Sequence, residues 1–330
     1  MTQRILIVGK RGGILQWYEH LLAAQKQLSE FELSGFALNH NHFVERAKKT
    51  IAGAFNKQLK EKITAKALDK KLTSFRPNLI LIADLFYLSE DVIAVLRKHK
   101  ETMKIAHWIG DFFDERLTKT SAITDQYYFT DSGLLDDAKK MGLAQSGYLP
   151  LAFNPDLFKQ PENEARINDL LFIGAWSKNR EELIRQVEPP MTVVGKGWDK
   201  IEDTHHNVMG KNVSNEQVAK LYQQHACVLN IINSGNITNG LNMRCFEAPA
   251  CGAVLITDDV VDLPNCYEDG VDVLTYENPE SLILIYKKLL EDENKLKRIA
   301  SAGHAKAANS HSYASRVHNI ALNISDLVDS

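Results

Sequence analysis

The sequence predicts two α/β domains, each built on a parallel, doubly wound sheet with helices on both faces. Three observations support this prediction. The chain has 330 residues, more than one hydrophobic core usually serves. Short apolar runs alternate with helical patterns along most of its length. A stretch rich in proline and charge, residues 154–168, interrupts the alternation, which then starts again.

The first half begins with a β–α–β pattern. The apolar run RILIVG covers residues 4–9, a helical pattern covers 15–28, and a second strand pattern follows at 31–38. Beyond it we expect helices at 58–73, 89–99 and 132–141, and strands at 78–84, 104–110 and 127–131. Strands that are apolar throughout and separated by helices are typical of a parallel sheet covered on both faces.

The second half repeats this alternation. Its strand patterns lie at 169–176, 191–197, 226–232, 252–257 and 272–276. The last long helices begin at Asn278, a suitable N-cap, with Pro279 in the first turn. We therefore predict an N-terminal domain over 1–153, a linker over 154–168, a C-terminal domain over 169–310, and a final helix, 311–330, that packs back on the first domain. Because doubly wound sheets bind ligands at the carboxyl ends of their strands, we expect the active site in a cleft between the domains.

The composition argues against several classes of protein. The 39 basic and 42 acidic residues give a formal charge of -3 with no long block of one sign, so we expect no nucleic-acid partner. No apolar stretch reaches the ~18 residues of a membrane span, which leaves only peripheral membrane contact open. The four cysteines form no CxxC pair, as expected of buried thiols in a reducing compartment rather than of disulfides or a zinc site. We expect a soluble, cytoplasmic protein.

The most informative stretch is NITNGLNMRCFEAPACGAVLIT, residues 236–257. A loop rich in Asn and Gly leads into a short helix that carries Arg244 and Glu247 three residues apart on one face. The N–H groups at such a helix start suit a phosphate, Arg244 adds a permanent charge, and Glu247 can accept two ribose hydroxyls. The pair would then hold a nucleoside diphosphate. The alternative, weighted equally on these residues alone, is an ordinary surface ion pair.

The same stretch resembles a known family. GLNMRCFEAPACGAVLITDDVVDLP, YEDGVDVLTYENPESL and AGHAKAANSHSYASRV are similar to the C-terminal domain of group 1 glycosyltransferases, closest to the branch of the spore-maturation (CgeB-like) proteins. HWIGDFFD and FTDSGLLDDAKKMGLAQSGYLPLAFNPDLF are similar to the first domain of that branch. The resemblance implies a GT-B fold, in which two Rossmann-like domains face one another across a cleft. It also implies a nucleotide-sugar donor held mainly by the second domain and an acceptor held mainly by the first.

The resemblance assigns roles by motif. It implies that Glu247 holds the donor ribose, that Arg244 holds the diphosphate, and that the sugar phosphate is lined by Asn239, Gly240, Leu241 and Asn242. The better-studied retaining members have a second glutamate eight positions before the first, where this chain has Asn239. That glutamate contacts the donor sugar, so the identity of the sugar and the stereochemical course stay open. The branch that this chain resembles generally lacks it too.

Three further stretches are candidates for the donor site. Lys178 and Arg180 begin the helix after the strand at 169–176 and could reach the donor phosphates; solvated surface charge is the alternative. Gly195 could leave space for a nucleobase, or it could form a tight turn without a ligand. Gly12 and Gly13 lack the spacing of a dinucleotide or P-loop fingerprint, but they would let the first loop approach the donor or the acceptor.

HWIGDFFD places polar groups at the end of a buried strand. An inverting transfer needs a base for the proton of the acceptor hydroxyl, which makes Asp111 the first catalytic candidate, with His107 and Asp114 beside it. The alternatives are a core histidine and helix-capping aspartates. DFFD lacks the DxD spacing of metal-dependent transferases, and the resemblance implies that helix dipoles and basic side chains neutralise the diphosphate. We therefore expect no metal and no other cofactor.

The sequence thus predicts a hexosyltransferase-type glycosyltransferase. It would move a sugar from a nucleoside-diphosphate donor to a glycan, lipid-linked or protein hydroxyl, in bacterial surface-polysaccharide or glycoprotein assembly. Two alternatives share the architecture: a sugar-nucleotide 2-epimerase, which would convert the donor alone, and a non-catalytic module that binds the nucleotide sugar without a base.

Overall fold

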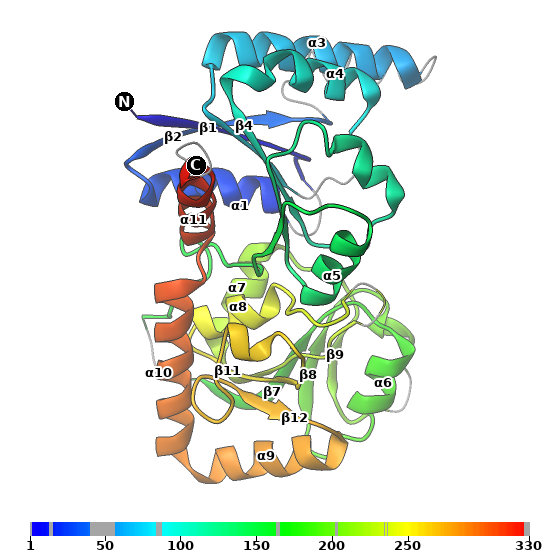
Figure 1. Cartoon of the computed structure of the whole chain (residues 1–330). Helices are drawn as coiled ribbons and strands as arrows, with labels where there is room; N and C mark the ends of the chain where they lie inside the picture. The colour runs from blue at the N-terminus through cyan, green and yellow to red at the C-terminus, as the bar shows by residue number, and fades with distance from the viewer. Residues whose placement is uncertain are drawn as a thin grey trace. The chain divides into compact units, whose positions relative to one another are not determined.

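Two compact units make up the chain in the computed structural model, which describes residues 2–12, 16–39, 57–83, 88–162, 166–201, 204–233, 235 and 237–326. The N-terminal unit consists of Met1–Pro150 and Tyr313–Ser330, and the C-terminal unit of Leu151–Ser312. Figure 1 shows both units, with labels on many of their helices and strands.

The N-terminal unit is built on a six-stranded parallel sheet in the order β2-β1-β3-β4-β5-β6. Its strands are β1 (Gln3–Gly9), β2 (Phe31–Ala37), β3 (Leu79–Ala83), β4 (Lys104–Ile109), β5 (Gln126–Phe129) and β6 (Ser146–Tyr148). Its helices are α1 (Trp17–Ala23), α3 (Lys57–Phe75), α4 (Glu90–His99), α5 (Ser132–Lys140) and α11 (Tyr313–Asp326). Contacts join α3 to α4 and α1 to α11 (Figure 1). Leu6, Val8 and Ile80 of the sheet share one buried cluster with Leu68 of α3 and Leu96 of α4.

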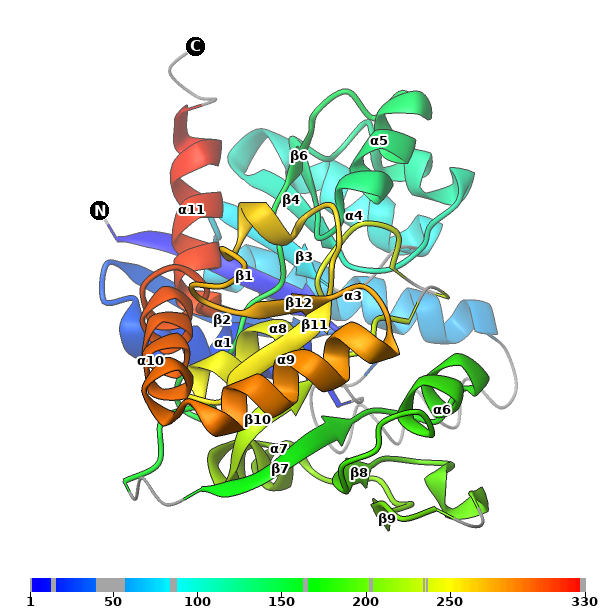
Figure 2. The same ribbon diagram turned by 90° about the horizontal axis from the view of Figure 1, so that it is seen from below.

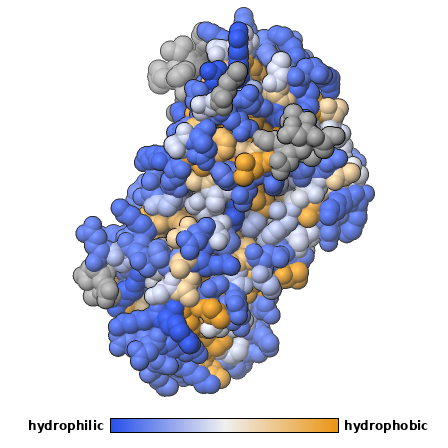
Figure 3. All heavy atoms as spheres, turned by 60° about the vertical axis from the view of Figure 1, so that its left-hand side comes forward, coloured by the Kyte–Doolittle hydropathy of each residue, from blue (hydrophilic) through white to orange (hydrophobic). Residues whose placement is uncertain are grey.

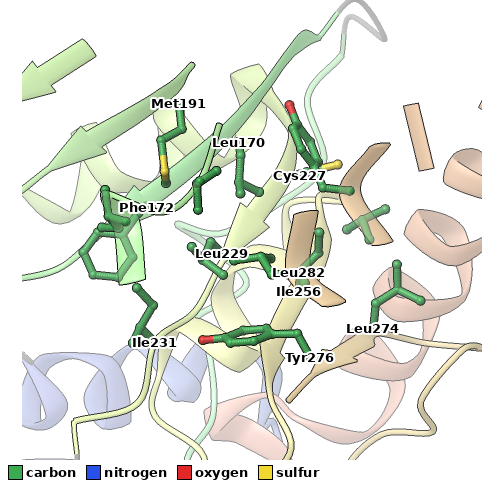
Figure 4. Close-up of a cluster of buried hydrophobic side chains, with 14 of the residues drawn as sticks. Leu170, Phe172, Met191, Cys227, Leu229, Ile231, Ile256, Leu274, Tyr276 and Leu282 are labelled. Carbon is green, nitrogen blue, oxygen red and sulfur yellow. The ribbon is translucent and has the colours of Figure 1, made fainter. Parts of the chain in front are cut away.

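The C-terminal unit has a second six-stranded parallel sheet, in the order β12-β11-β10-β7-β8-β9. Its strands are β7 (Ile167–Ile173), β8 (Met191–Val194), β9 (Asn207–Met209), β10 (His225–Leu229), β11 (Val254–Asp258) and β12 (Leu274–Tyr276). Its helices are α6 (Lys178–Ile184), α7 (Asn215–Gln224), α8 (Arg244–Ala250), α9 (Pro279–Glu291) and α10 (Glu293–Ser310). The last two are in contact (Figure 2). Figure 4 shows the core of this unit, where Phe172, Leu229 and Ile256 of three neighbouring strands pack with Leu282 of α9.

The start of α9 shows how the sequence sets an element. The Asn278 side chain accepts a hydrogen bond from the N–H of Ser281, the Ser281 hydroxyl accepts one from the N–H of Asn278, and Pro279 occupies the first helical position. These contacts satisfy N–H groups that a helix start otherwise leaves unpaired.

The C-terminal unit begins at Leu151, so the expected linker, 154–168, lies within that unit. Residues of that stretch pack on the C-terminal unit: Phe158 is buried, and Arg166 donates hydrogen bonds to the carbonyl oxygens of Tyr222, His225 and Cys251. Buried carbonyl groups need such partners, so the end of this stretch is held to the unit that follows it. The final helix α11 belongs to the N-terminal unit.

The face shown in Figure 3 is mainly polar. Hydrophilic side chains cover most of the face shown in Figure 3, and hydrophobic ones gather in small separate groups. Among the described residues, no helix combines the length and the apolar character that crossing a bilayer requires.

Candidate functional site

The strand order of the C-terminal sheet reverses between β7 and β10. From β7 the chain adds β8 and β9 on one side, and it then adds β10, β11 and β12 on the other. Doubly wound sheets bind ligands in the crevice outside the carboxyl ends of the strands at such a reversal. Polar groups lie at this edge, in the segments that follow β7, β10 and β11. Their charge and hydrogen-bonding groups determine which ligands the site can bind.

Arg244, at the start of α8, is held on three sides. Its guanidinium donates a hydrogen bond to Asn230 Oδ1, which also accepts one of 2.8 Å from Asn242 Nδ2. The guanidinium carbon lies 5.5 Å from the centre of the Phe172 ring. On another side, a Cβ added to Gly174 would lie 3.1 Å from an Arg244 nitrogen. The Nε of Arg244 is buried and has no hydrogen-bond partner. The contacts with Asn230 and Phe172 fix the guanidinium in position.

Glu247, one turn further along α8, is buried with 8% of its surface exposed. Among the described residues no group donates a hydrogen bond to its carboxyl, which also forms no ion pair with Arg244. Burial raises the pKa of Glu247 to about 7, and the nearby charge of Arg244 opposes that shift. The surface ion pair considered as an alternative is thus not formed, since both side chains turn into the structure and remain separate.

Arg180 of α6 has a different role from the one predicted. It is buried, and its guanidinium donates to the carbonyl oxygens of Ile231 at 2.9 Å and Ala175 at 2.9 Å. These carbonyls follow β10 and β7, so Arg180 ties together the two strand ends that flank the reversal. Burial lowers the pKa of Arg180 to about 10, with the like charge of Arg244 adding to the shift. We correct the expectation that Arg180 reaches the phosphates: it braces the site and contributes positive potential.

The loop before α8 brings four predicted residues to this edge: Asn239, Gly240, Leu241 and Asn242. Leu241 is buried, and the Asn239 carbonyl accepts the N–H of Asp262 at 3.1 Å. The N–H groups of Asn242, Met243 and Arg244 have no acceptor among the described residues. Three consecutive free N–H groups beside a fixed guanidinium favour an anion.

Two other donor-site predictions meet different surroundings from those expected. Lys178 has 86% of its side chain exposed and pairs with Glu182 at 3.7 Å, because it lies on the solvent side of α6. Gly195 has φ +150°, and a Cβ there would lie 2.0 Å from the Gly174 carbonyl oxygen. Gly195 therefore makes room for neighbouring backbone, and we correct the expectation that it leaves space for a nucleobase.

In the N-terminal unit the structure does not bring the predicted catalytic residues together. His107 lies in the middle of β4 with 0% exposure, and neither ring nitrogen has a hydrogen-bond partner. Burial lowers its pKa to about 3. We correct the expectation that His107 lies at the sheet edge: it is a core residue that does not reach a ligand. Asp114 caps the short helix at 115–120 and pairs with Arg116 at 2.6 Å.

Asp111 is exposed on the loop after β4, where its carboxylate accepts the N–H of Phe112 at 2.9 Å. Gly12 follows β1 with φ +74°, a conformation that favours glycine, and its N–H donates to Glu19 at 2.8 Å. Gly13 lies outside the described residues. Of the N-terminal candidates, Asp111 and Gly12 lie at the carboxyl ends of strands.

Sequence reasoning missed Asn230, which organises the site. Asn230 is fully buried, and its Nδ2 donates to Thr257 Oγ1 at 3.0 Å and to Cys245 Sγ at 3.3 Å. Its backbone carbonyl oxygen accepts a hydrogen bond of 3.2 Å from the hydroxyl of Tyr276. A signal was present, because Asn230 is a polar residue inside the apolar run ACVLNII.

Residues 172–321, less than half of the chain, match the family model described as glycosyl transferase-like. No curated protein matches the chain. Among solved structures, the chain is similar to the Anabaena protein HepE in complex with UDP, at 12% identity over 98% of this chain and 100% of that chain, with a TM-score of 0.64.

Two more solved structures share the architecture. A glycosyltransferase from Rickettsia africae matches at 10% identity, over 100% of both chains, with a TM-score of 0.67. A putative UDP-N-acetylglucosamine 2-epimerase from Listeria monocytogenes matches at 13% identity, over 94% of this chain and 95% of that chain, with a TM-score of 0.55. The two parallel sheets and these likenesses identify the fold as GT-B.

Proposed function

We propose that the chain is a glycosyltransferase that moves a sugar from a nucleoside-diphosphate-sugar donor to a hydroxyl acceptor. The family match over residues 172–321 and the likeness to HepE, solved with UDP, support this reaction class. The geometry supports it independently, because fixed polar groups gather where a sheet of this topology binds nucleotides.

The observation that carries the proposal is the buried, unpartnered carboxyl of Glu247. A largely buried carboxyl to which no described protein group donates has accepting capacity left for a ligand. Two neighbouring hydroxyls, such as those of a ribose, would supply the donors. The positive charge of Arg244 and the free N–H groups before it would hold an anion on the adjoining side. A nucleoside diphosphate meets both needs at once.

In this proposal the chemistry depends on stabilising the departing diphosphate. Asn230 and Phe172 hold the guanidinium of Arg244 in place before the donor binds, so little reorganisation is needed as charge develops. Arg180 adds positive potential from behind the site. We propose that these two cations and the loop N–H groups balance the diphosphate without a metal or other cofactor.

Asp111 is the proposed general base. Its exposed carboxylate lies at the carboxyl end of β4, where it could take the proton of an acceptor hydroxyl. We further propose a hexosyl transfer of the CgeB-like branch, in the cytoplasm, to a glycan, lipid-linked or protein acceptor of bacterial surface assembly. The motif resemblance supports these finer assignments.

The test is a thermal-shift and calorimetric screen against UDP, GDP and dTDP and their common sugar conjugates, with NAD and ATP as controls. We expect one nucleoside diphosphate to raise the melting temperature selectively. Glu247→Ala should abolish this shift. Thr192→Val, which changes a buried side chain of the same unit and removes its hydrogen bond to Asp169, should retain it. No response to any diphosphate at millimolar concentration, or an undiminished response in Glu247→Ala, would refute the proposal.

A 2-epimerase is the second candidate, because the Listeria epimerase shares the architecture. The two reactions differ in their need for an acceptor. Incubation with UDP-N-acetylglucosamine and no acceptor would give the 2-epimer if the chain is an epimerase. A transferase leaves that sugar configuration unchanged, so formation of the 2-epimer would contradict the transferase proposal.

A further inference from the structure

Phe172, Gly174 and Trp176 lie at the end of β7 and in the loop that follows it. The Gly174 N–H donates to the Val194 carbonyl at 2.9 Å, and the Trp176 N–H donates to the Lys196 carbonyl at 2.9 Å. Two backbone hydrogen bonds therefore hold the chain beside β8 and the loop after it as far as Trp176, although β7 ends at Ile173 and the chain bends at Gly174. Phe172, Gly174 and Trp176 follow one another in a short row along this part of the chain.

The inner end of this row is the Arg244 site. The Phe172 ring lies under the Arg244 guanidinium, and a Cβ on Gly174 would lie 3.1 Å from it. Two extended residues span at most about 7 Å, so Trp176 lies one short step beyond the cation. The row thus leads from the position proposed for the diphosphate to an indole ring.

Trp176 is the outer end of the row, and it is exposed. Its exposed fraction is 41%, whereas those of Trp17, Trp108 and Trp198 are 3%, 0% and 0%. The chain contains four tryptophans, so Trp176 alone among them offers aromatic surface to a ligand.

The indole of Trp176 is fixed in place. Its N–H donates to Glu181 Oε2 at 2.6 Å, and Arg185 donates to the other oxygen of that carboxylate at 2.8 Å. On the neighbouring loop, a Cβ on Gly197 would lie 3.1 Å from Cβ of Trp176, so a glycine there leaves this approach clear. A ring held by its N–H keeps its face available at little cost in side-chain entropy.

We propose that Trp176 is the stacking platform for the nucleobase of the donor. The inference rests on the proposed function, because it takes Glu247 and Arg244 to hold the ribose and the diphosphate. The base is the remaining part of the nucleotide, and it is a flat aromatic ring. Stacking on tryptophan accepts any base, so this contact adds affinity, while hydrogen bonds elsewhere select the base.

The test compares a nucleotide with a base-free anion. Calorimetry measures binding of UDP, GDP and inorganic pyrophosphate to the wild type, Trp176→Ala and Trp176→Phe. Leu284→Ala, which removes an exposed apolar side chain from α9, is the matched control. We expect Trp176→Ala to weaken the tighter of the two nucleotides by about 5- to 150-fold. Trp176→Phe should restore most of that affinity, and pyrophosphate should bind all variants alike.

Fluorescence gives a direct readout of contact. Acrylamide should quench the emission of Trp176 in the free protein, and a bound nucleotide should protect it. Equal nucleotide affinity in Trp176→Ala and Leu284→Ala would overturn the inference while leaving the proposed function standing. An equal loss of pyrophosphate binding would also overturn it, because Trp176 would then support the anion site. If the wild type binds neither nucleotide, the proposed function fails and this inference with it.

Discussion

Replacing Glu247 by Gln should make stability less dependent on pH. Burial raises the pKa of this carboxyl from 4.5 to about 7. A carboxyl whose pKa is higher in the folded state binds its proton more tightly there. Its stabilising contribution is complete below the unfolded pKa and is lost as pH rises through the folded pKa. Wild type should therefore lose stability between pH 5 and pH 8, whereas an amide at position 247 does not titrate.

The size of the effect follows from the shift. One pKa unit corresponds to about 1.4 kcal/mol, so the shift amounts to roughly 3 kcal/mol, of which about 2.5 kcal/mol falls between pH 5 and pH 8. Urea denaturation of the wild type and Glu247→Gln at both pH values measures it. Subtracting one protein from the other at each pH removes the contributions of all other titrating groups.

Ligand affinity should change in the opposite direction. Ribose hydroxyls donate to the carboxylate form, so UDP-glucose should bind wild type about tenfold more tightly at pH 8 than at pH 6. Glu247→Gln should bind weakly at both. A wild type and a variant whose stabilities change in parallel from pH 5 to pH 8 would refute the reasoning, because Glu247 would then ionise as an ordinary exposed carboxyl.

Three further substitutions test a residue proposed for donor binding, one proposed for catalysis and one that only packs in the core. Asn230→Ala leaves Arg244 without its acceptor; it should weaken UDP-glucose binding about tenfold and lower stability by about 1–3 kcal/mol, measured by calorimetry and urea denaturation. Binding equal to that of wild type would contradict its positioning role. Asp111→Asn should reduce kcat at least about 100-fold in a steady-state transfer assay while donor affinity stays constant; unchanged kcat would remove Asp111 as the base. His107→Phe should keep full activity and an equal or higher Tm, because it removes buried nitrogens that have no partner; a loss of turnover would show that His107 acts in catalysis.

Most strands of the two sheets could be predicted from the sequence, because buried parallel strands are continuous apolar runs. LILIA in β3 and ACVL within β10 are runs of this kind. The edge strands β6, SGY, and β9, NVM, were not predicted, since three residues at a sheet edge carry no such run. Their pairing comes from the neighbouring strand, which local sequence does not reveal.

Half of the candidate site could be predicted from local spacing. Arg244 and Glu247 share one short helix, so their spacing and motif mark them together. Asn230 reaches Arg244 from the end of another strand, a contact that only the folded sheet creates. Lys178 and Arg180 show the same limit, because residues two apart on a helix face different sides and packing alone decides which is buried.

The most direct test of the central claim compares UDP with its 2′,3′-dideoxy analogue. If Glu247 accepts the ribose hydroxyls, calorimetry should show that wild type binds UDP at least about tenfold more tightly than the analogue. Glu247→Ala should bind the two ligands equally. Equal affinity in the wild type, or a preference for UDP that survives in Glu247→Ala, would contradict the assignment of Glu247 to the ribose.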